Sequence, residues 1–251
     1  MIQYNPLLLD DIESEKNGTD FCYPEEDKAV LQEMLGEINQ YAGTDFHYLA
    51  ELNSFNIHGS GEIMVRYIHR FLSEWIRAII IWQLVSDKLK DCDKLTLQMY
   101  LHFKASDEYI SEPGCSDPAH IYVTYDNAIR KLKPKRLKKD LLELARNPRD
   151  AFYLPFTMRM LASWKMPEMK DILISYASPE SITAQDVGLK DSEKPYFPSL
   201  DYIKRELIFT AIDGLKYYPS PEVRDVITSF EASADKDIQS AAKRTLKVLT
   251  K

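Results

Sequence analysis

The chain has 251 residues, of which 45% are hydrophobic and 28% charged, and its net charge is −7. These values are typical of a globular protein with an ordinary core. Three widely spaced cysteines, Cys22, Cys92 and Cys115, exclude a disulfide framework and a CxxC metal pair. The short apolar run near the N-terminus follows no basic region, and the longest uninterrupted apolar run elsewhere is only Ala78 to Trp82, so we expect a cytoplasmic protein without a membrane segment.

Acidic residues concentrate in the first quarter of the chain. Residues 1–60 contain twelve acids and two bases, whereas the rest of the chain has a small positive balance. An acidic segment attracts a basic partner from a distance and raises its association rate. We therefore take Asp10, Asp11, Glu13 and Glu15 as candidate protein-binding residues. The alternative is a solvated surface, or a segment that covers a basic face of the protein itself.

Residues 1–110 are predicted to form an acidic, helical N-terminal region. Glycines are few and alternating apolar runs are rare, which favours helix over strand. Apolar spacing predicts helices over residues 24–41, 44–55, 62–88 and 94–106. The helix over 62–88 carries so many large apolar side chains that we expect burial on more than one side. The loop 111–118 then separates this region from the rest of the chain.

Helical hairpins are predicted over residues 119–251, with helices at 119–132, 135–146, 149–164 and 167–176 before an interruption. The segment 178–198 is polar and is broken by Pro179, Gly188 and Pro195, so it cannot continue a helix. Because loops inserted into a rigid scaffold often bind, Tyr196 and Phe197 are candidate contact residues. A linker without a role is the alternative.

Two stretches of the second half are alike at a separation of 54 residues. Aligning Pro167 with Pro221 superimposes PEMKDILISYAS on PEVRDVITSFEAS, and the preceding helices superimpose through Leu161 and Leu215. A final helix follows, for which Asp235 or Asp237 is the expected N-cap. An internal repeat of helix pairs predicts stacked helical hairpins.

The C-terminal segment resembles the short HEAT-like repeats, also called bilin-lyase-type repeats. Their first helix typically opens with an acid, Val-Arg, paired alanines and a leucine, and DKDIQSAAKRTL matches this pattern with Gln239 in place of the arginine. Their second helix often begins Pro-Glu, as at Pro167 and Pro221. The resemblance implies an all-α fold in which a helical cap precedes a short HEAT-like α-α superhelix, continuous with it as one unit. Helical hairpins of an unrelated all-α domain are the alternative.

No stretch of the chain carries a recognisable catalytic signature. His47, His58 and His69 recur every eleven residues, but Gly59 and Gly61 interrupt the helix that would align them, so we predict no metal site. The Gly59-Ser60-Gly61 sequence is too short for a phosphate loop. The sequence implies no catalytic residues and no cofactor, although it does not exclude an enzyme.

One segment is strongly basic. The stretch RKLKPKRLKK contains Arg130, Lys131, Lys133, Lys135, Arg136, Lys138 and Lys139. A patch of this kind contacts phosphates, and HEAT-like DNA glycosylases place a basic concave surface against duplex DNA. The other interpretation is a solvated face around the turn at Pro134.

We expect a protein-binding module without catalysis, because HEAT-like repeats often present a concave face to a partner. Lys170 and Asp171 recur as Arg224 and Asp225 on the helices expected to line that face, although they serve equally well as ion pairs between repeats. By analogy of fold alone, an acidic protein of this size is similar to immunity proteins that neutralise basic, nuclease-type toxins. A nucleic-acid-binding protein or HEAT-like DNA glycosylase that uses residues 130–139 is the alternative. The oligomeric state does not follow from the sequence.

Overall fold

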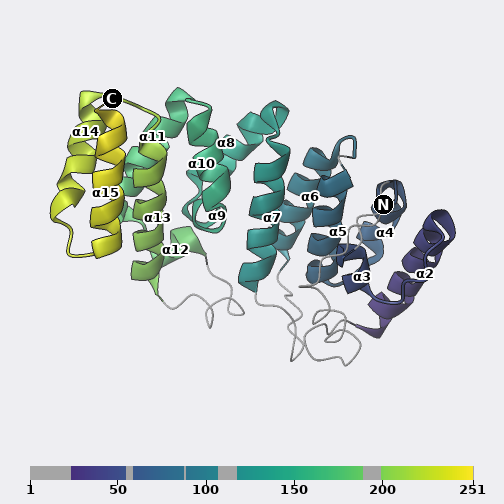
Figure 1. Ribbon diagram of the computed structural model, residues 1–251. Helices are drawn as coiled ribbons and strands as arrows, with labels where there is room; N and C mark the ends of the chain where they lie inside the picture. Colours follow the sequence, from purple (N-terminus) through teal and green to yellow (C-terminus); the bar gives the residue numbers. More distant parts are fainter. Residues whose placement is uncertain (1–23, 55–58, 88, 107–117, 189–198, 251) are drawn as a thin grey trace. The chain divides into compact units, whose positions relative to one another are not determined.

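The computed structural model describes residues 24–54, 59–87, 89–106, 118–188 and 199–250 (Figure 1). Every regular element within these ranges is an α-helix or a short 3-10 helix, so the described part of the chain is all-α. None of its helices is long and apolar enough to cross a membrane. The chain divides into two units, Met1–Leu132 and Lys133–Lys251.

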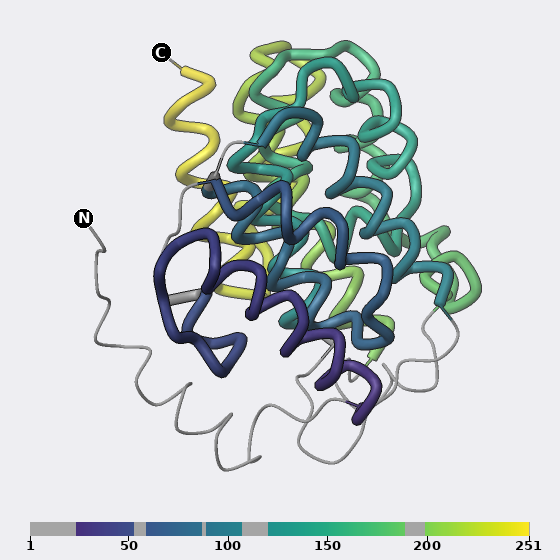
Figure 2. The backbone as a smooth tube through the Cα atoms, turned by 90° about the vertical axis from the view of Figure 1, so that its right-hand side faces the viewer, coloured from purple at the N-terminus to yellow at the C-terminus, as the bar shows by residue number. Residues whose placement is uncertain are grey.

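Unit 1 is organised around the apolar helix α5, which packs against α3, α4, α6 and α7. Ile76, Ile80, Ile81 and Leu84 of α5 are fully buried. Figure 2 follows the chain from α2 at the purple end through the blue helices of this unit. The elements of unit 1 are α2 (Glu25–Ala42), α3 (Leu49–Ser54), α4 (Gly61–Tyr67), η2 (Ile68–Arg70), α5 (Glu74–Asp87), α6 (Cys92–Ala105) and α7 (Pro118–Leu132).

The single helix predicted over residues 62–88 is wrong, because the chain breaks between η2 and α5. Phe71 is extended, with ψ at 142°. The buried carboxylate of Asp27 in α2 accepts hydrogen bonds from the backbone N–H groups of Leu72 and Ser73, each at 2.7 Å. A carboxylate that satisfies two N–H groups where a helix begins stabilises the break. Leu72 and Ser73 lie 45 and 46 positions after Asp27 in the chain, so local periodicity could not reveal this contact.

Unit 2 consists of shorter helices, several of which begin at a proline. Its elements are η3 (Lys135–Leu137), α8 (Lys138–Arg146), α9 (Pro148–Tyr153), α10 (Pro155–Ser163), α11 (Pro167–Ala177), η4 (Pro179–Ser181), α12 (Ala184–Val187), α13 (Leu200–Leu215), α14 (Pro221–Thr228), η5 (Ser229–Ala232) and α15 (Lys236–Leu249). Proline is well suited to the first helical turn, because its missing N–H would have no partner there.

Two boundaries in this half of the chain differ from the sequence prediction. The helix predicted over 149–164 is two helices, α9 and α10, because Pro155 opens a new helix and disfavours helical geometry at Leu154. The helix α7, which was expected to open the repeats, clusters with unit 1. The described part of the interrupting segment contains η4 and α12, while Tyr196 and Phe197 lie outside the described residues.

Helix α13 is the central element at the C-terminal end of unit 2. It packs against α10 and α11 and also against α15, while α14 packs against α15 and touches α11 (Figure 1). The positions paired by the 54-residue alignment are buried alike: Leu161 with Leu215, Met169 with Val223 and Leu173 with Ile227 are all fully buried. The apolar stripes that defined the repeat in the sequence therefore point into the core.

Gly214 allows α13 to lie very close to its neighbours. A Cβ atom at this position would stand 2.8 Å from Cδ1 of Leu173 in α11 and 3.4 Å from Cβ of Ala162 in α10. Both neighbours are fully buried, so neither side chain has free space to move into. Gly36, in contrast, is exposed in the middle of α2 and has no atom within 4 Å of such a Cβ.

Alanine substitutions at these two glycines should change stability in opposite directions. Gly36→Ala should raise the free energy of unfolding by about 0.5 to 1 kcal/mol, because alanine favours helix without a clash. Gly214→Ala should lower it by about 1 to 2 kcal/mol, because overpacking outweighs the same helical gain. Urea unfolding of both variants measures this. Equal stabilisation by both would show that α11 and α13 do not pack closely at Gly214.

Candidate functional site

Lys170 and Asp171 on α11 occupy the same positions as Arg224 and Asp225 on α14. Lys170 is half-buried, and the other three residues are exposed. Asp10, Asp11, Glu13 and Glu15 lie outside the described residues, as do Tyr196 and Phe197.

In the first copy, this position is covered by the start of α14. Lys170 Nζ donates a hydrogen bond to Oε2 of Glu222 at 2.8 Å and lies 3.9 Å from Asp171. The hydrogen bond to Glu222 raises the pKa of the Lys170 ammonium group. The Tyr218 hydroxyl, just before α14, donates to the Met166 carbonyl at 2.9 Å. Lys170 and Glu222 therefore form an ion pair that joins α11 to α14.

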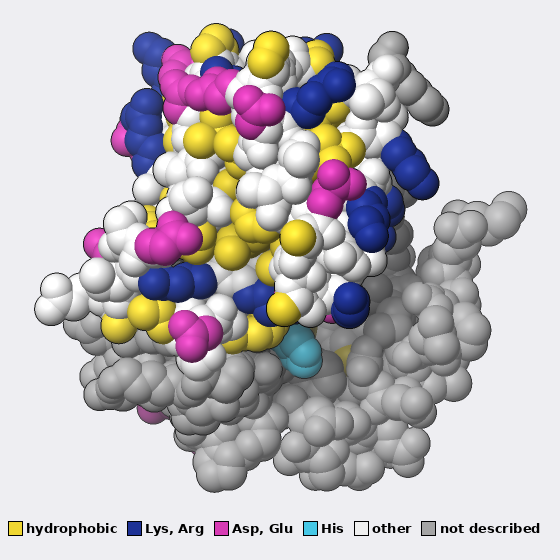
Figure 3. Space-filling model, turned by 90° about the vertical axis from the view of Figure 1, so that its left-hand side faces the viewer, with side chains coloured by type: hydrophobic (Ala, Val, Ile, Leu, Met, Phe, Trp, Pro, Cys, Tyr) yellow, Lys and Arg dark blue, Asp and Glu magenta, His cyan; other side chains and the backbone are white. Residues whose placement is uncertain are grey.

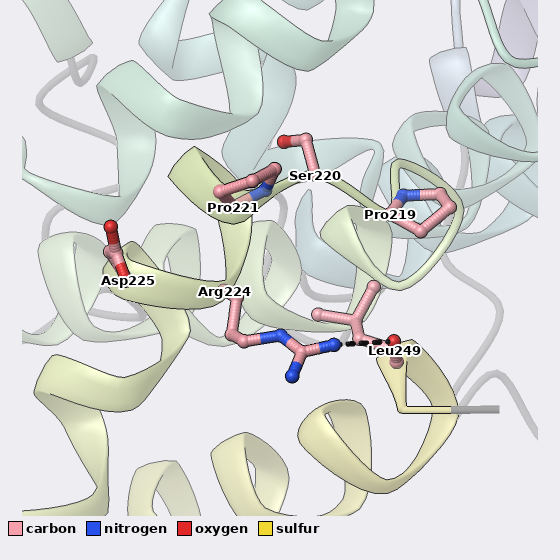
Figure 4. Close-up of a pocket in the computed structure, with 6 residues that line it drawn as sticks. All are labelled: Pro219, Ser220, Pro221, Arg224, Asp225 and Leu249. Atoms are coloured by element: carbon pink, nitrogen blue, oxygen red, sulfur yellow. Dashed lines mark hydrogen bonds between the residues drawn. The ribbon is translucent and has the colours of Figure 1, made fainter.

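In the second copy, the corresponding position faces an open hollow. Arg224 donates from Nη2 to the carbonyl of Leu249, at the end of α15, at 3.0 Å (Figure 4). A hollow of about 420 Å³ is lined by Pro219, Ser220, Pro221, Arg224, Asp225 and Leu249. The remaining guanidinium N–H groups and the Asp225 carboxylate are thus placed beside a space that a partner side chain can enter.

Apolar side chains gather on the same end of unit 2. Figure 3 faces the end of this unit that carries α14 and α15, and it shows hydrophobic side chains in the middle of the surface with charged side chains around them. Val248 of α15 is 51% exposed. Val226, Phe230 and Leu246 are half-buried. An apolar centre with a charged rim is typical of a protein interface.

A charged contact positions α15 against α13. Arg205 of α13 donates to Asp235 at 2.6 Å and to Asp237 at 2.7 Å. Asp235 is the N-cap of α15 and accepts from the backbone N–H groups of Asp237 and Ile238. The Arg205 hydrogen bond and these backbone donors lower the pKa of the Asp235 carboxyl. Farther along α15, the Thr245 hydroxyl donates to the Ile212 carbonyl at 3.1 Å.

The seven basic residues of the segment 130–139 are exposed, as a nucleic-acid interface would require. Arg130, Lys131, Lys133, Lys135, Arg136, Lys138 and Lys139 all have exposed side chains. Lys131 lies 4.7 Å from the ring centre of Trp82 and also donates a hydrogen bond to the Ser86 hydroxyl, so its side chain contacts α5 within unit 1. Lys138 and Lys139 begin α8, where the positive end of the helix dipole adds to their own charge.

Most described acids of the first quarter have partners within unit 1. Asp27 holds the start of α5, as described above. Glu33 pairs with Arg70 at 2.5 Å, and Glu37 pairs with Arg66. Glu37 also accepts from the hydroxyl of Tyr67, which raises the pKa of that tyrosine to about 12. The described acids of this region therefore partly stabilise the fold of unit 1.

A buried charged cluster lies on α5 and α6, and the sequence analysis missed it. Oε1 of Glu74 accepts hydrogen bonds from Nη1 of Arg77 at 2.6 Å and, when Nδ1 of His102 is protonated, from that nitrogen at 2.9 Å. Arg77 also donates to the carbonyl of Phe71. Glu74 Oε2, Arg77 Nε and the Tyr125 hydroxyl are buried without a hydrogen-bond partner in the described residues. The sequence feature that could have revealed this cluster is the pair of charged residues, Glu74 and Arg77, inside the otherwise apolar stretch EWIRAIII.

Among the residues that the structure describes, no group of three or more His, Cys, Asp or Glu side chains is arranged to hold a metal ion. Glu222 and Tyr218, which complete the contact around Lys170, were not predicted as site residues. The sequence shows that these two residues lie four positions apart at the start of a Pro-Glu helix. It does not show their partners, because those contacts depend on the packing of α14 against α11.

In comparisons with known proteins, no family model, no curated protein and no solved structure matches the chain.

The Arg205–Asp235 contact should make stability depend on pH on the acid side. Because the pKa of Asp235 is lowered in the folded state, its contribution is present above the ordinary value of 3.8 and is lost as pH falls through the lower, folded value. Asp235→Asn keeps the capping oxygen but loses the charge. The variant should be less stable than wild type at pH 7, and the difference should shrink below pH 3.8.

Thermal unfolding followed by circular dichroism between pH 7 and pH 2.5 measures this, with Asp225→Asn on the exposed surface of α14 as the control. A difference between wild type and Asp235→Asn that stays constant over this range would show that Arg205 does not stabilise the charged form of Asp235.

The buried cluster should tolerate loss of both charges better than loss of one. Arg77→Met leaves the Glu74 carboxylate buried without its closest cation, which should cost roughly 3 to 5 kcal/mol. Adding Glu74→Gln should recover a large part of that loss, because no charge then remains buried. Urea unfolding of the single and double variants tests this, and a double variant less stable than Arg77→Met alone would contradict it.

Proposed function

We propose that this chain is a non-catalytic protein-binding module, built as a helical N-terminal part followed by HEAT-like hairpins. The 54-residue repeat, the matched burial of its two copies and the pairing of α10 with α11 and of α14 with the hairpin before it support a repeat architecture. Stacked hairpins commonly offer extended surfaces to protein partners.

The observation that carries the proposal is the contrast between Lys170 and Arg224. The two residues are equivalent by the repeat, yet Lys170 is used by Glu222 of the next hairpin, whereas Arg224 is exposed beside the hollow. We define the binding face as Arg224, Asp225, Val248 and the residues that line this hollow. Arginine at an interface of this kind is a frequent energetic anchor.

The partner class that we propose is a basic protein, of which a nuclease-type toxin neutralised by an immunity protein is one form. The net charge of −7 supports attraction of a basic partner, and screening by salt would weaken that attraction. Asp10, Asp11, Glu13 and Glu15 belong to this part of the proposal. It rests on charge and on fold analogy, whereas the binding face rests on the contacts above.

A nucleic-acid-binding protein is the second candidate, favoured by one observation. All seven bases of residues 130–139 are exposed, and five of them lie around η3 and the first turn of α8. Phosphate contacts from such a cluster would make binding steeply dependent on salt. The two candidates require different residues, so they can be separated by substitution.

The test is retention of a partner on the immobilised full chain from an extract of the producing cells, with and without nuclease. We expect a protein, identified by mass spectrometry, to be retained after nuclease treatment. Arg224→Glu with Asp225→Lys should abolish retention. Lys139→Glu with Asp140→Lys, a matched exchange of neighbouring charges on α8, should leave it unchanged.

The opposite pattern would reject the proposal. Retention of DNA or RNA that is lost with the α8 exchange and kept with the α14 exchange would establish the nucleic-acid alternative. Retention of the protein by both variants would mean that the binding face lies elsewhere. Circular dichroism of each variant serves as the control for folding.

A further inference from the structure

The repeat provides an internal example of what fits against the start of the second helix in a hairpin. The 54-residue alignment pairs Met166, Pro167, Lys170 and Asp171 with Ser220, Pro221, Arg224 and Asp225. Four of the residues that line the hollow are therefore second copies of first-copy residues, and two of those, Met166 and Lys170, are contacted in the first copy by Tyr218 and Glu222.

The covering segment makes two polar contacts in a defined register. Tyr218 donates its hydroxyl to the carbonyl of Met166 at 2.9 Å, and four residues later Glu222 accepts from Lys170 at 2.8 Å. Glu222 stands in the first turn of α14, where a carboxylate is also favoured by the helix dipole. A hydroxyl donor before a helix and an acid in its first turn thus fit this surface.

The second copy retains the groups that these contacts need. The Ser220 carbonyl accepts the backbone N–H of Arg224 at 3.0 Å, as the Met166 carbonyl accepts that of Met169 at 3.1 Å. Each carbonyl has a second lone pair for a hydroxyl. Arg224 uses one N–H for Leu249, and a guanidinium has five, so it can hold that carbonyl and a carboxylate together.

The neighbouring acid does not prevent such a contact. Asp171 lies 3.9 Å from Lys170, and Lys170 still pairs with Glu222. Asp225 is the equivalent neighbour of Arg224. An incoming carboxylate would therefore meet the same local charges in the second copy as Glu222 meets in the first.

We propose that the hollow at Arg224 receives the first turn of a partner protein's helix, which carries an acid for Arg224 and, four residues earlier, a hydroxyl for the Ser220 carbonyl. This rests on the proposed protein-binding function and specifies its binding face. The partner helix would lie on α14 as α14 lies on α11. A local acid of this kind is compatible with a partner that is basic as a whole, because only one carboxylate is required.

A peptide with the sequence of residues 216–230 of this chain is the probe, because it contains the hydroxyl and the acid in the required register. Its helix is held by a side-chain lactam between the exposed positions 224 and 228 of the peptide, which carry Arg224→Lys and Thr228→Glu for this purpose, since isolated short helices are marginal in water. Binding of the labelled peptide to the full chain is followed by fluorescence anisotropy up to about 1 mM, the range of a weak single-helix contact.

We expect saturable binding that weakens about tenfold when the protein carries Arg224→Glu. A peptide with Glu222→Lys should bind wild type equally poorly and should recover affinity for the Arg224→Glu protein. Tyr218→Phe in the peptide should weaken binding without affecting this exchange. Lys139→Glu in the protein is the matched control and should change nothing.

Absence of saturable binding, or a loss that the charge exchange does not restore, would overturn this inference. Partner retention that depends on Arg224 would then still support the proposed function, so the two failures are distinguishable. Sedimentation of the full chain at increasing concentration tests whether a second copy of this chain occupies the hollow instead. Self-association abolished by Arg224→Glu would replace the partner helix with a second copy of this chain and overturn the inference.

Discussion

The close contact of α13 with α11 at Gly214 is the constraint on which the C-terminal half depends. With no Cβ at this position, the helix axis can approach Leu173 and Ala162 directly. That approach sets where the chain leaves α13 and therefore where Tyr218 and Glu222 meet the start of α11. Interiors are close-packed and transmit such displacements, so a shift at Gly214 would also move the polar contacts around Lys170.

The buried polar groups of unit 1 differ in how completely their hydrogen-bonding capacity is used. The Asp27 carboxylate receives two backbone hydrogen bonds and replaces a turn of helix by a fixed break. Glu74 and Arg77 satisfy each other only in part, since each has a buried polar atom without a partner in the described ranges. Burial of imperfectly paired charges costs stability, and the contact between Glu74 and His102 joins α5 to α6 within this cluster.

Net charge describes the free surface of this protein poorly. The first quarter has a large excess of acids, yet Asp27, Glu33 and Glu37 have partners in unit 1. In the basic segment the seven basic residues are exposed, and two of them, Arg130 and Lys131, also have partners within unit 1. Charge counted along the chain is thus a guide to association only after internal pairs are removed.

The sequence by itself determined the helical class and most helix starts, because these depend on local chemistry. Apolar spacing of 3.6 residues, prolines in first turns and Asp235 as an N-cap act within a few residues of each other. Ile227 and Leu215 were placed in the core by the same periodicity and are fully buried.

Only the tertiary structure decided which of the repeated polar residues form an ion pair with another part of the protein. Lys170 and Arg224 look equivalent in sequence, and one is paired while the other lies beside a hollow, because a helix packs over the first position and the hollow opens at the second. The break before α5 and the Glu74–Arg77–His102 cluster likewise join residues that are distant in the chain. Such contacts arise when packed elements bring them together, and no local pattern contains that information.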